Sequence, residues 1–493
     1  EGQQYFRQSA WDSAVASYDR AIEIDSTFSI ALMHDGMSRG WVGGTADSGA
    51  ISLMQRGARH NHGLAPRDSL LVQAAAQFAT LGASENSGPP FTVQRALFAT
   101  LHEAVRRYPT DPEAWYALGD AQYHWGWGPE IGVTERDVVR SFDRAIALDS
   151  AFSPAYIHAI EMAFRYGTAN GRRYLAAYLA QNPTDVDAEG MRLASRLSDP
   201  ALAGTPETRE MLDTASADQL QHASNAVAEW GDSAQTLVRL QRLIVAGRHH
   251  RDAAFADTAR TRRRLTFALA SRGLGAEAMK NKPTGELLLK LALFGAAPVA
   301  LADSVVMEDI LHERTCVPCA VSFWGMRGDT ARLQRIIHLG DSVARDPHAK
   351  VDRGRITFTL DLDRAYLTLA RHDTTEALRQ FLALPDSLCH ACGWAMLTQA
   401  QLLESRGRNP EAAAILDELS VYNDLLGTLA ELERGRIAEK LGDKPRARDA
   451  YSFVADIWQR GDPAFQVYVS EARAGLKRLN EESSATAIPI RKP

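Results

Sequence analysis

The four cysteines of this 493-residue chain fall into two pairs with the spacing Cys-x-x-Cys. The first pair is Cys316 and Cys319, and the second pair, Cys389 and Cys392, begins 73 residues later (389 − 316). Thiolates at this spacing could bind zinc, close a local disulfide or take part in thiol–disulfide exchange. Because no cysteine stands outside a pair, the pattern indicates a purpose beyond incidental packing in a core.

Histidine pairs are a second possible source of chemistry. His60 and His62 flank an asparagine, and His249 precedes His250 directly. Neither pair has a carboxylate or a third histidine at a spacing that would complete a metal site. We interpret these histidines as solvated turn residues, and we expect no metal and no cofactor.

The run from Arg260 to Arg264 contains four arginines. Such a run could bind a phosphate or an acidic partner. More often it is a solvated helix face whose alkyl stems cover apolar surface, and we favour this interpretation.

Two tryptophans, Trp125 and Trp127, lie in a glycine-flanked insertion at 124–130. Exposed tryptophans are common anchors of protein interfaces. The alternative is that they fold back over a neighbouring helical hairpin, and the sequence leaves both interpretations open.

No arrangement for catalysis is found. Asp361 and Asp363 are two residues apart, so on a helix they face different directions and cannot work as an acid–base pair. The sequence also shows no nucleophile–base arrangement and no glycine loop that would bind phosphates. We therefore expect no catalytic residue.

The elements that carry these residues are predicted to be helical hairpins. Residues 111–120 read DPEAWYALGD, in which Trp115, Leu118 and Gly119 have the W-x2-L-G spacing of the first helix of a tetratricopeptide repeat (TPR). Phe142 and Ala145 then take the large and small positions of the second helix. Small residues let the two helices approach, and the aromatic ring fills the space between them. The predicted fold class is an all-α, TPR-like helical-hairpin solenoid that forms a right-handed superhelix.

An internal duplication supports this interpretation. The stretch from Ile24 to Ser29 reads IDSTFS, and the stretch from Leu148 to Ser153 reads LDSAFS, 124 residues later (148 − 24). We predict an N-terminal TPR array at 1–197, degenerate helical repeats at 208–312, a C-terminal TPR array at 313–481 and a disordered tail at 482–493. The proline- and glycine-containing stretch 198–207 is the predicted break.

The repeat organisation bears on the cysteines. In a stacked array the units contact only their neighbours, so two pairs about two units apart disfavour one shared four-cysteine zinc site. Two local disulfides, which imply an oxidising compartment, are favoured over reduced structural thiols. Thioredoxin-like exchange lacks the expected βαβ context. All four alternatives remain open, and the four cysteines are the disulfide or redox candidates.

Composition excludes several classes of protein. A net charge of −6 with both signs mixed along the chain argues against a nucleic-acid-binding face. The longest apolar run, Leu287 to Ala302, contains Lys290 and is shorter than the roughly 20 residues that span a bilayer. The chain begins at Glu1 without a methionine, so we expect either a processing site there or the edge of a piece of a longer protein. An extracytoplasmic location (periplasm or cell surface) is slightly favoured over a cytoplasmic one.

The segments YPTDPEAWYALG, LDSAFSPAY and LGDKPRARDAYSFVADIWQRGDPAFQ resemble TPR regions attached to bacterial serine/threonine protein kinases and to SARP-type or cyclase-type regulators. The resemblance covers nearly the whole chain and is strongest at 1–180 and 360–480. It implies a sensory or scaffolding part of a signalling protein. No kinase motif is present, neither the H-R-D loop nor D-F-G.

The predicted function is a non-catalytic scaffold that binds a peptide or protein partner on its concave face. Alternatives are a thiol–disulfide redox protein, or the regulatory region of a kinase whose catalytic domain lies upstream of Glu1. Candidate partner-binding residues are those of the first helices outside the packing positions, together with the two loop tryptophans: His34, Arg39, Gln122, Tyr123, Trp125, Trp127, His158, Glu161 and Arg165.

Overall fold

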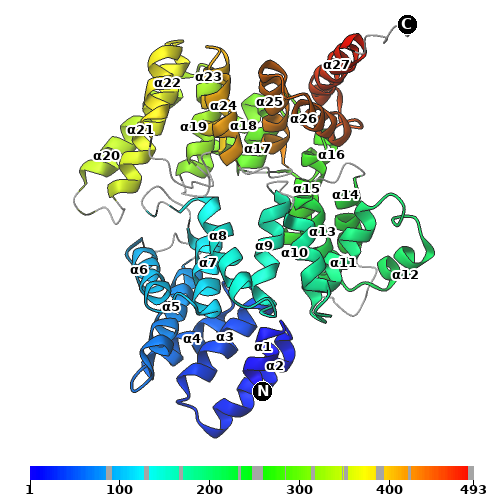
Figure 1. Ribbon diagram of the computed structural model, residues 1–493. Helices are drawn as coiled ribbons and strands as arrows, with labels where there is room; N and C mark the ends of the chain where they lie inside the picture. The colour runs from blue at the N-terminus through cyan, green and yellow to red at the C-terminus, as the bar shows by residue number, and fades with distance from the viewer. Residues whose placement is uncertain are drawn as a thin grey trace, which may run out of the picture. The chain divides into compact units, whose positions relative to one another are not determined.

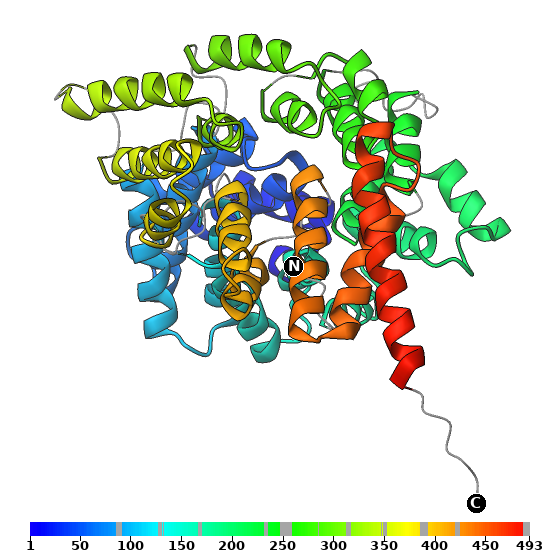
Figure 2. The same cartoon turned by 90° about the horizontal axis from the view of Figure 1, so that it is seen from above.

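A computed structural model describes residues 1–84, 91–126, 131, 133–165, 170–230, 235–246, 259–283, 285–311, 317–346, 348, 353–384, 393–419 and 424–486. Within these ranges the regular elements are all helices, and no residue is in a strand (Figures 1 and 2). The helices pair into successive hairpins, so the predicted all-α, TPR-like solenoid is confirmed. The handedness of its superhelix stays a prediction.

The described residues divide into two compact units, unit 1 at Glu1–Ala188 and unit 2 from Glu189 on. The finer four-part division expected from the sequence stays a prediction. The helices of unit 1 are α1 (Gly2–Arg7), α2 (Trp11–Ile24), α3 (Ser29–Gly43), α4 (Ser48–Arg59), α5 (Pro66–Ala83), α6 (Phe91–Arg107), α7 (Pro112–Trp125), α8 (Glu135–Leu148), α9 (Pro154–Arg165) and α10 (Asn170–Leu179), and α11 (Val186–Ser198) crosses the boundary.

The hairpin of α7 and α8 shows how the TPR pattern folds. The Asp111 carboxylate caps α7 by accepting hydrogen bonds from the backbone amides of Glu113 (2.9 Å) and Ala114 (3.3 Å). Gly119 lies so close to the buried Phe142 ring that an added Cβ would be 3.0 Å from it. The consensus glycine therefore permits the close approach of the two helices.

Hairpins of unit 1 stack by two kinds of contact. The second helix of each hairpin packs on the first helix of the next, as α2 does on α3 and α4 on α5. The first helices α1, α3, α5, α7 and α9 also contact one another in sequence order. This neighbour-to-neighbour packing is the defining feature of a helical-repeat array.

The first helices of unit 1 also meet across several hairpins. The Trp41 Nε1 of α3 donates a hydrogen bond to the Tyr116 hydroxyl of α7 (3.0 Å), and the Trp41 ring stacks on His158 of α9. The Phe6 ring of α1 packs 6.3 Å from Phe152, just before α9, between ring centroids. Side chains on the inner side of these helices are therefore packed against one another.

The duplicated sequence stretch forms the same turn twice. Asp25 Oδ1 accepts a hydrogen bond from the amide of Thr27 (2.9 Å), and Asp149 Oδ1 accepts one from the amide of Ala151 (3.1 Å). Each turn closes a hairpin and leads into the next first helix, α3 or α9. The predicted equivalence of the two copies is thus seen in their local structure.

Unit 2 continues the helical hairpins. Its helices are α12 (Pro206–Thr214), α13 (Ala217–Glu229), α14 (Thr236–Val245), α15 (Ala259–Ser271), α16 (Gly275–Lys280), α17 (Gly285–Leu293), α18 (Val299–Leu311), α19 (Val317–Met326), α20 (Thr330–Arg345), α21 (Arg353–Ala370), α22 (Thr374–Leu382), α23 (Gly393–Glu404), α24 (Asn409–Glu418), α25 (Leu425–Leu441), α26 (Lys444–Ile457) and α27 (Pro463–Thr486). α27 extends to Thr486, so the first residues of the predicted disordered tail are helical; the remainder, 487–493, lies outside the described ranges.

Unit 2 also contains contacts between its C-terminal hairpin and the segment from α15 to α17, which we call the end closure. Trp458, just after α26, is fully buried and donates a hydrogen bond from Nε1 to the carbonyl of Ser271 (3.1 Å), 187 residues earlier. The Asp462 carboxylate accepts from the amide of Ala276 (2.6 Å). Phe294 packs against Trp458 with 5.5 Å between ring centroids. The C-terminal hairpin thus completes the packing around α15 to α17.

A buried ion pair lies in the same region. Lys290 Nζ of α17 is 2.6 Å from Asp424 Oδ2, at the start of α25, and 2.6 Å from Glu286 Oε1. Lys290 is thus a paired charge in the apolar run that the sequence analysis singled out. None of the helices in the described ranges is both long and apolar enough to cross a bilayer.

Candidate functional site

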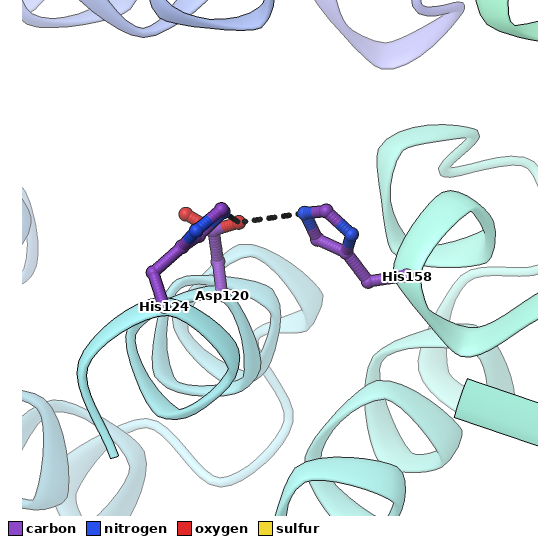
Figure 3. A group of neighbouring side chains, drawn as sticks. All are labelled: Asp120, His124 and His158. Carbon is purple, nitrogen blue, oxygen red and sulfur yellow. Dashed lines mark ion pairs between the residues drawn. The ribbon is translucent and has the colours of Figure 1, made fainter. Parts of the chain in front are cut away.

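Two histidines and an aspartate converge in unit 1 from neighbouring first helices (Figure 3). Asp120 and His124 lie four residues apart on α7, so they share one face of that helix. His158 projects toward them from α9 (Figure 3). Asp120 Oδ1 is 3.5 Å from His158 Nε2 and 3.7 Å from His124 Nε2. We call these three residues the histidine–aspartate cluster.

His158 is held in place from its other ring nitrogen. Its Nδ1 lies 2.8 Å from Glu161 Oε2, and the Tyr123 hydroxyl donates a hydrogen bond to the same oxygen (3.0 Å). The Tyr123 ring stacks on the imidazole with 3.9 Å between centroids and 16° between planes. Trp41 also stacks on it, at 5.0 Å. These contacts fix the imidazole so that Nε2 points at Asp120.

The two histidines differ in charge. Burial alone would lower the pKa of His158, but the hydrogen bonds and charges of Asp120 and Glu161 outweigh it and raise the pKa to about 9. Burial lowers the pKa of His124, with the Asp120 charge opposing it. The protein at neutral pH therefore has a cationic His158 between two carboxylates, beside a neutral His124.

Exposure falls from one side of the cluster to the other. The exposed fraction of the side chain is 28% for His124, 17% for Asp120 and 9% for His158. Imidazole nitrogens and a carboxylate are also the ligand types that transition metals take in proteins. The cluster is therefore partly open to solvent, through His124 and Asp120.

The structure gathers Tyr123, His158 and Glu161 from the predicted partner-binding set, but it does not make a common surface of the whole set. His34 is buried, with Nε2 3.2 Å from Glu113 Oε1. Gln122 is buried and accepts a hydrogen bond from the Ser141 hydroxyl (2.7 Å). A partner could not reach these two side chains as they stand.

Trp125 is also buried, with its ring 5.8 Å from Phe78 of α5 between centroids. It folds back over the neighbouring hairpin, which was one of its two expected placements. Trp127 lies outside the described residues, and for Arg165 only the backbone, at the end of α9, is described.

The reason for this burial is the packing of first helices across unit 1. A first-helix position outside the TPR consensus was expected to face an open concave surface. The inner side chains of α1, α3, α7 and α9 contact one another. Several of these positions are therefore buried by side chains of unit 1 itself and do not face solvent. Arg39, Tyr123 and Glu161 keep partial exposure, and Arg39 pairs with Asp35 (3.0 Å) and Asp19 (2.7 Å).

A groove of about 550 Å³ opens elsewhere in unit 1, between α4, α5 and α6. No charged side chain lines it among the described residues. Asn61 Oδ1 and Gln77 Oε1 are buried there without a hydrogen-bond partner in the described structure. The lining residues of this groove, the α4–α6 groove, are Ala58, Asn61, Gln73, Ala76, Gln77, Thr80, Thr92, Val93 and Ala96.

Other sequence candidates have mixed outcomes. Cys316, Cys389 and Cys392 lie outside the described residues, and Cys319 is placed only by its backbone in α19, so the disulfide and redox interpretations stay predictions. His60 and His62 lie 6.5 Å apart between ring centroids and belong to no metal-type group in the described ranges. His249 and His250 are outside those ranges. The arginine run lies in α15, where Arg262 and Arg263 are exposed.

The sequence did not predict the histidine–aspartate cluster, because neither of its two residue pairs is distinctive alone. Asp120 and His124 form a D-x3-H pair on α7, and His158 and Glu161 form an H-x2-E pair on α9. Both spacings place two ligand-type side chains on one helix face. The signal would have come from noticing that the two pairs occupy successive first helices.

The comparisons with known proteins add little to this description. No protein-family model matches the sequence, and no curated protein matches it. Among solved structures, the chain is similar to the TPR domain of P58(IPK), with 12% identity, 82% of this chain and 98% of that chain covered, and a TM-score of 0.18. It is also similar to Naa15/Naa10 bound to HypK-THB, with 10% identity, 98% and 79% covered, and a TM-score of 0.20. TM-scores this low carry no argument about this chain. Its assignment to the helical-repeat proteins is based on the helical hairpins described above.

Proposed function

We propose that this chain is a protein-interaction scaffold, and that unit 1 binds an extended peptide segment of its partner in the α4–α6 groove. The observation that carries the proposal is the pair of buried amide oxygens, Asn61 Oδ1 and Gln77 Oε1, that line the groove without hydrogen-bond partners. A buried acceptor without a donor costs about 1–3 kcal/mol. A ligand that supplies N–H donors would recover that free energy once a side-chain rotation turns either oxygen toward the groove.

The composition of the groove indicates the kind of segment that fits. Small side chains of Ala58, Ala76 and Ala96 would let a peptide backbone approach closely. Thr80 and Thr92 add hydroxyls, and the lining carries no charge. An extended, uncharged segment with small side chains meets these conditions, because its backbone amides would donate to the two orphaned oxygens.

The filled inner side of unit 1 supports this choice of surface. A peptide on the inner row of first helices would have to displace packed rings such as Trp41 and Tyr116. No aromatic ring lines the α4–α6 groove, so a peptide there would displace none. The partly exposed Arg39, Tyr123 and Glu161 stay candidates for contacts with a larger partner.

The proposal can be tested by selecting peptides from a random display library and measuring their affinity by fluorescence polarisation. Ala96→Trp fills the groove and is expected to weaken binding at least tenfold. Ala99→Trp, on the same helix but outside the lining, is the matched control and should leave affinity unchanged. Equal affinities for the two variants would reject the groove as the binding surface.

The alternative functions concern parts of the chain that are not described, or lie beyond it. A thiol–disulfide function depends on the two cysteine pairs, and the regulatory-region hypothesis depends on residues before Glu1. Both stay predictions.

A further inference from the structure

We propose that the histidine–aspartate cluster of unit 1 is a binding site for a divalent transition-metal ion, with Zn²⁺ as the ion it fits best. Its ligands are Asp120 and His124 of α7 and His158 of α9. This inference is independent of the peptide groove, because no residue is shared between the two sites.

Two of the three distances between ligand atoms are close to those of a zinc site. With Zn–N and Zn–O bonds of about 2.0–2.1 Å, neighbouring ligand atoms of a tetrahedron are about 3.3–3.5 Å apart. Asp120 Oδ1 lies 3.5 Å from His158 Nε2 and 3.7 Å from His124 Nε2. The three ligand atoms all lie within 4.8 Å of one another, so small side-chain rotations would bring them around one ion.

The surroundings of His158 are those of a metal ligand. A histidine ligand usually donates its second ring N–H to a carboxylate, which fixes the tautomer and the ring orientation. His158 Nδ1 has such a partner in Glu161 Oε2 at 2.8 Å, and Tyr123 holds that carboxylate in turn. His158 Nε2 is buried, makes no hydrogen bond of normal geometry with any described group and points into the cluster (Figure 3).

The ligand set decides which metal is expected. Two imidazole nitrogens and one carboxylate suit zinc and its first-row neighbours, whereas Ca²⁺ and Mg²⁺ prefer sites made of oxygen ligands. Three protein ligands leave a fourth position, and the partial exposure of His124 and Asp120 gives water access to it. The ion would cross-link α7 to α9, the first helices of successive hairpins.

The alternative is a purely structural role, in which a protonated His158 forms ion pairs with Asp120 and Glu161. In that case His158 needs the proton on Nε2, and a metal ion has no place. When a metal binds, that proton is released to solvent and the imidazole stays bonded to Glu161 through Nδ1. The metal-site interpretation predicts one bound ion per chain at this cluster, and the ion-pair interpretation predicts none. Metal uptake can be measured directly.

The test uses the full chain without a purification tag, stripped with chelator and titrated with Zn²⁺ in calorimetry. We expect one equivalent to bind. Co²⁺ is the second probe, since a site with nitrogen and oxygen ligands in four-coordinate geometry gives intense visible d–d bands. Thermal unfolding with and without Zn²⁺ is a further readout, because an ion that binds only the folded chain raises the unfolding temperature.

Three variants and one control locate the site. Asp120→Asn and His124→Gln alter the two more exposed ligands with least risk to folding, and each is expected to weaken Zn²⁺ affinity at least tenfold. Glu161→Gln changes a positioning residue only; loss of a partner of this kind typically costs 10–100-fold in metal affinity. The double variant His60→Ala/His62→Ala is the control and should leave uptake unchanged.

Two results would overturn the proposal. One is uptake of less than 0.5 equivalent by the wild-type chain at a hundredfold excess of Zn²⁺ with no Co²⁺ bands. The other is unchanged affinity in both Asp120→Asn and His124→Gln with circular dichroism like that of the wild type. If a variant fails to fold, the Co²⁺ spectrum of a chain whose four cysteines are changed to serine decides, because thiolate ligands are then absent and octahedral solvent-bound Co²⁺ has only weak bands.

Discussion

At the scale of single residues, two aspartates of α21 show how burial changes the properties of a side chain. Asp361 and Asp363 were expected to face different directions on one helix, and they do: the Asp361 side chain is 53% exposed, whereas Asp363 is buried in α21. Asp363 Oδ1 lacks a hydrogen-bond partner among the described residues. Burial raises the pKa of Asp363 to about 8, with the Arg364 charge opposing the shift.

Asp363 should therefore make stability depend on pH. Between the ordinary Asp pKa of about 4 and a folded-state pKa of about 8, the folded chain holds a proton that the unfolded chain has lost. The free energy of unfolding then falls as pH rises through this window. Asp363→Asn cannot ionise, so its unfolding temperature should equal that of the wild type near pH 5 and exceed it near pH 9. Calorimetric scans across this range measure the difference.

Asp361→Asn is the control for that experiment. Its carboxylate is exposed and should give no growing difference from pH 5 to pH 9. The difference in unfolding temperature between the wild type and Asp363→Asn could instead stay constant from pH 5 to pH 9. That result would mean that Asp363 is already ionised in the folded state.

At the scale of elements, glycines show where helices touch. On α3, Gly36 faces α4 so closely that an added Cβ would lie 2.8 Å from the Ala50 carbonyl oxygen, whereas a Cβ on Gly40 would meet nothing within 4 Å. Gly36→Ala is expected to lower stability by about 1–3 kcal/mol, because the two backbones must separate. Gly40→Ala should raise it by up to about 1 kcal/mol through helix propensity. Urea unfolding of both variants tests the opposite signs.

If Gly36→Ala and Gly40→Ala changed stability in the same direction, the close approach of α3 and α4 would not be a constraint on the fold. Both positions lie on α3, but only a Cβ at position 36 would meet a neighbouring helix. Helix propensity favours alanine over glycine at both positions, so it alone cannot change stability in opposite directions.

The elements were also the part of the structure that could be predicted best. A few residues at consensus TPR positions predict a helical hairpin by their spacing, without knowledge of the rest of the chain: Trp115, Leu118, Gly119 and Phe142. The histidine–aspartate cluster could not be predicted in the same way, because its members meet only when α7 and α9 lie side by side. The contact between His34 and Glu113 likewise joins residues that are 79 positions apart (113 − 34).

At the scale of the whole molecule, each unit gains contacts that a linear stack lacks. In unit 2, Trp458 is fully buried and joins the C-terminal hairpin to α15 and α17. Trp458→Ala is expected to cost about 3–5 kcal/mol and to lower hydrogen-exchange protection both at 444–486 and at 259–294. Mass spectrometry of exchange at the level of peptides measures both segments.

Leu416→Ala is the comparison for that variant. Leu416 is buried in the separate core of α23 to α25, so its effect should stay near 393–441. If Trp458→Ala lost protection only in its own hairpin, the C-terminal hairpin and the segment from α15 to α17 would be energetically independent despite their contact.

The end closure of unit 2 has a consequence for the time course of biosynthesis. Ser271 leaves the ribosome 187 residues before its partner Trp458. At about 5–20 residues per second, the segment around α15 to α17 waits about 10–40 seconds for the surface that covers Phe294. During this interval its apolar face is open to chaperones and to neighbouring nascent chains. Slower translation of the last two hundred codons should therefore lower the yield of folded protein more than slower translation of the first two hundred.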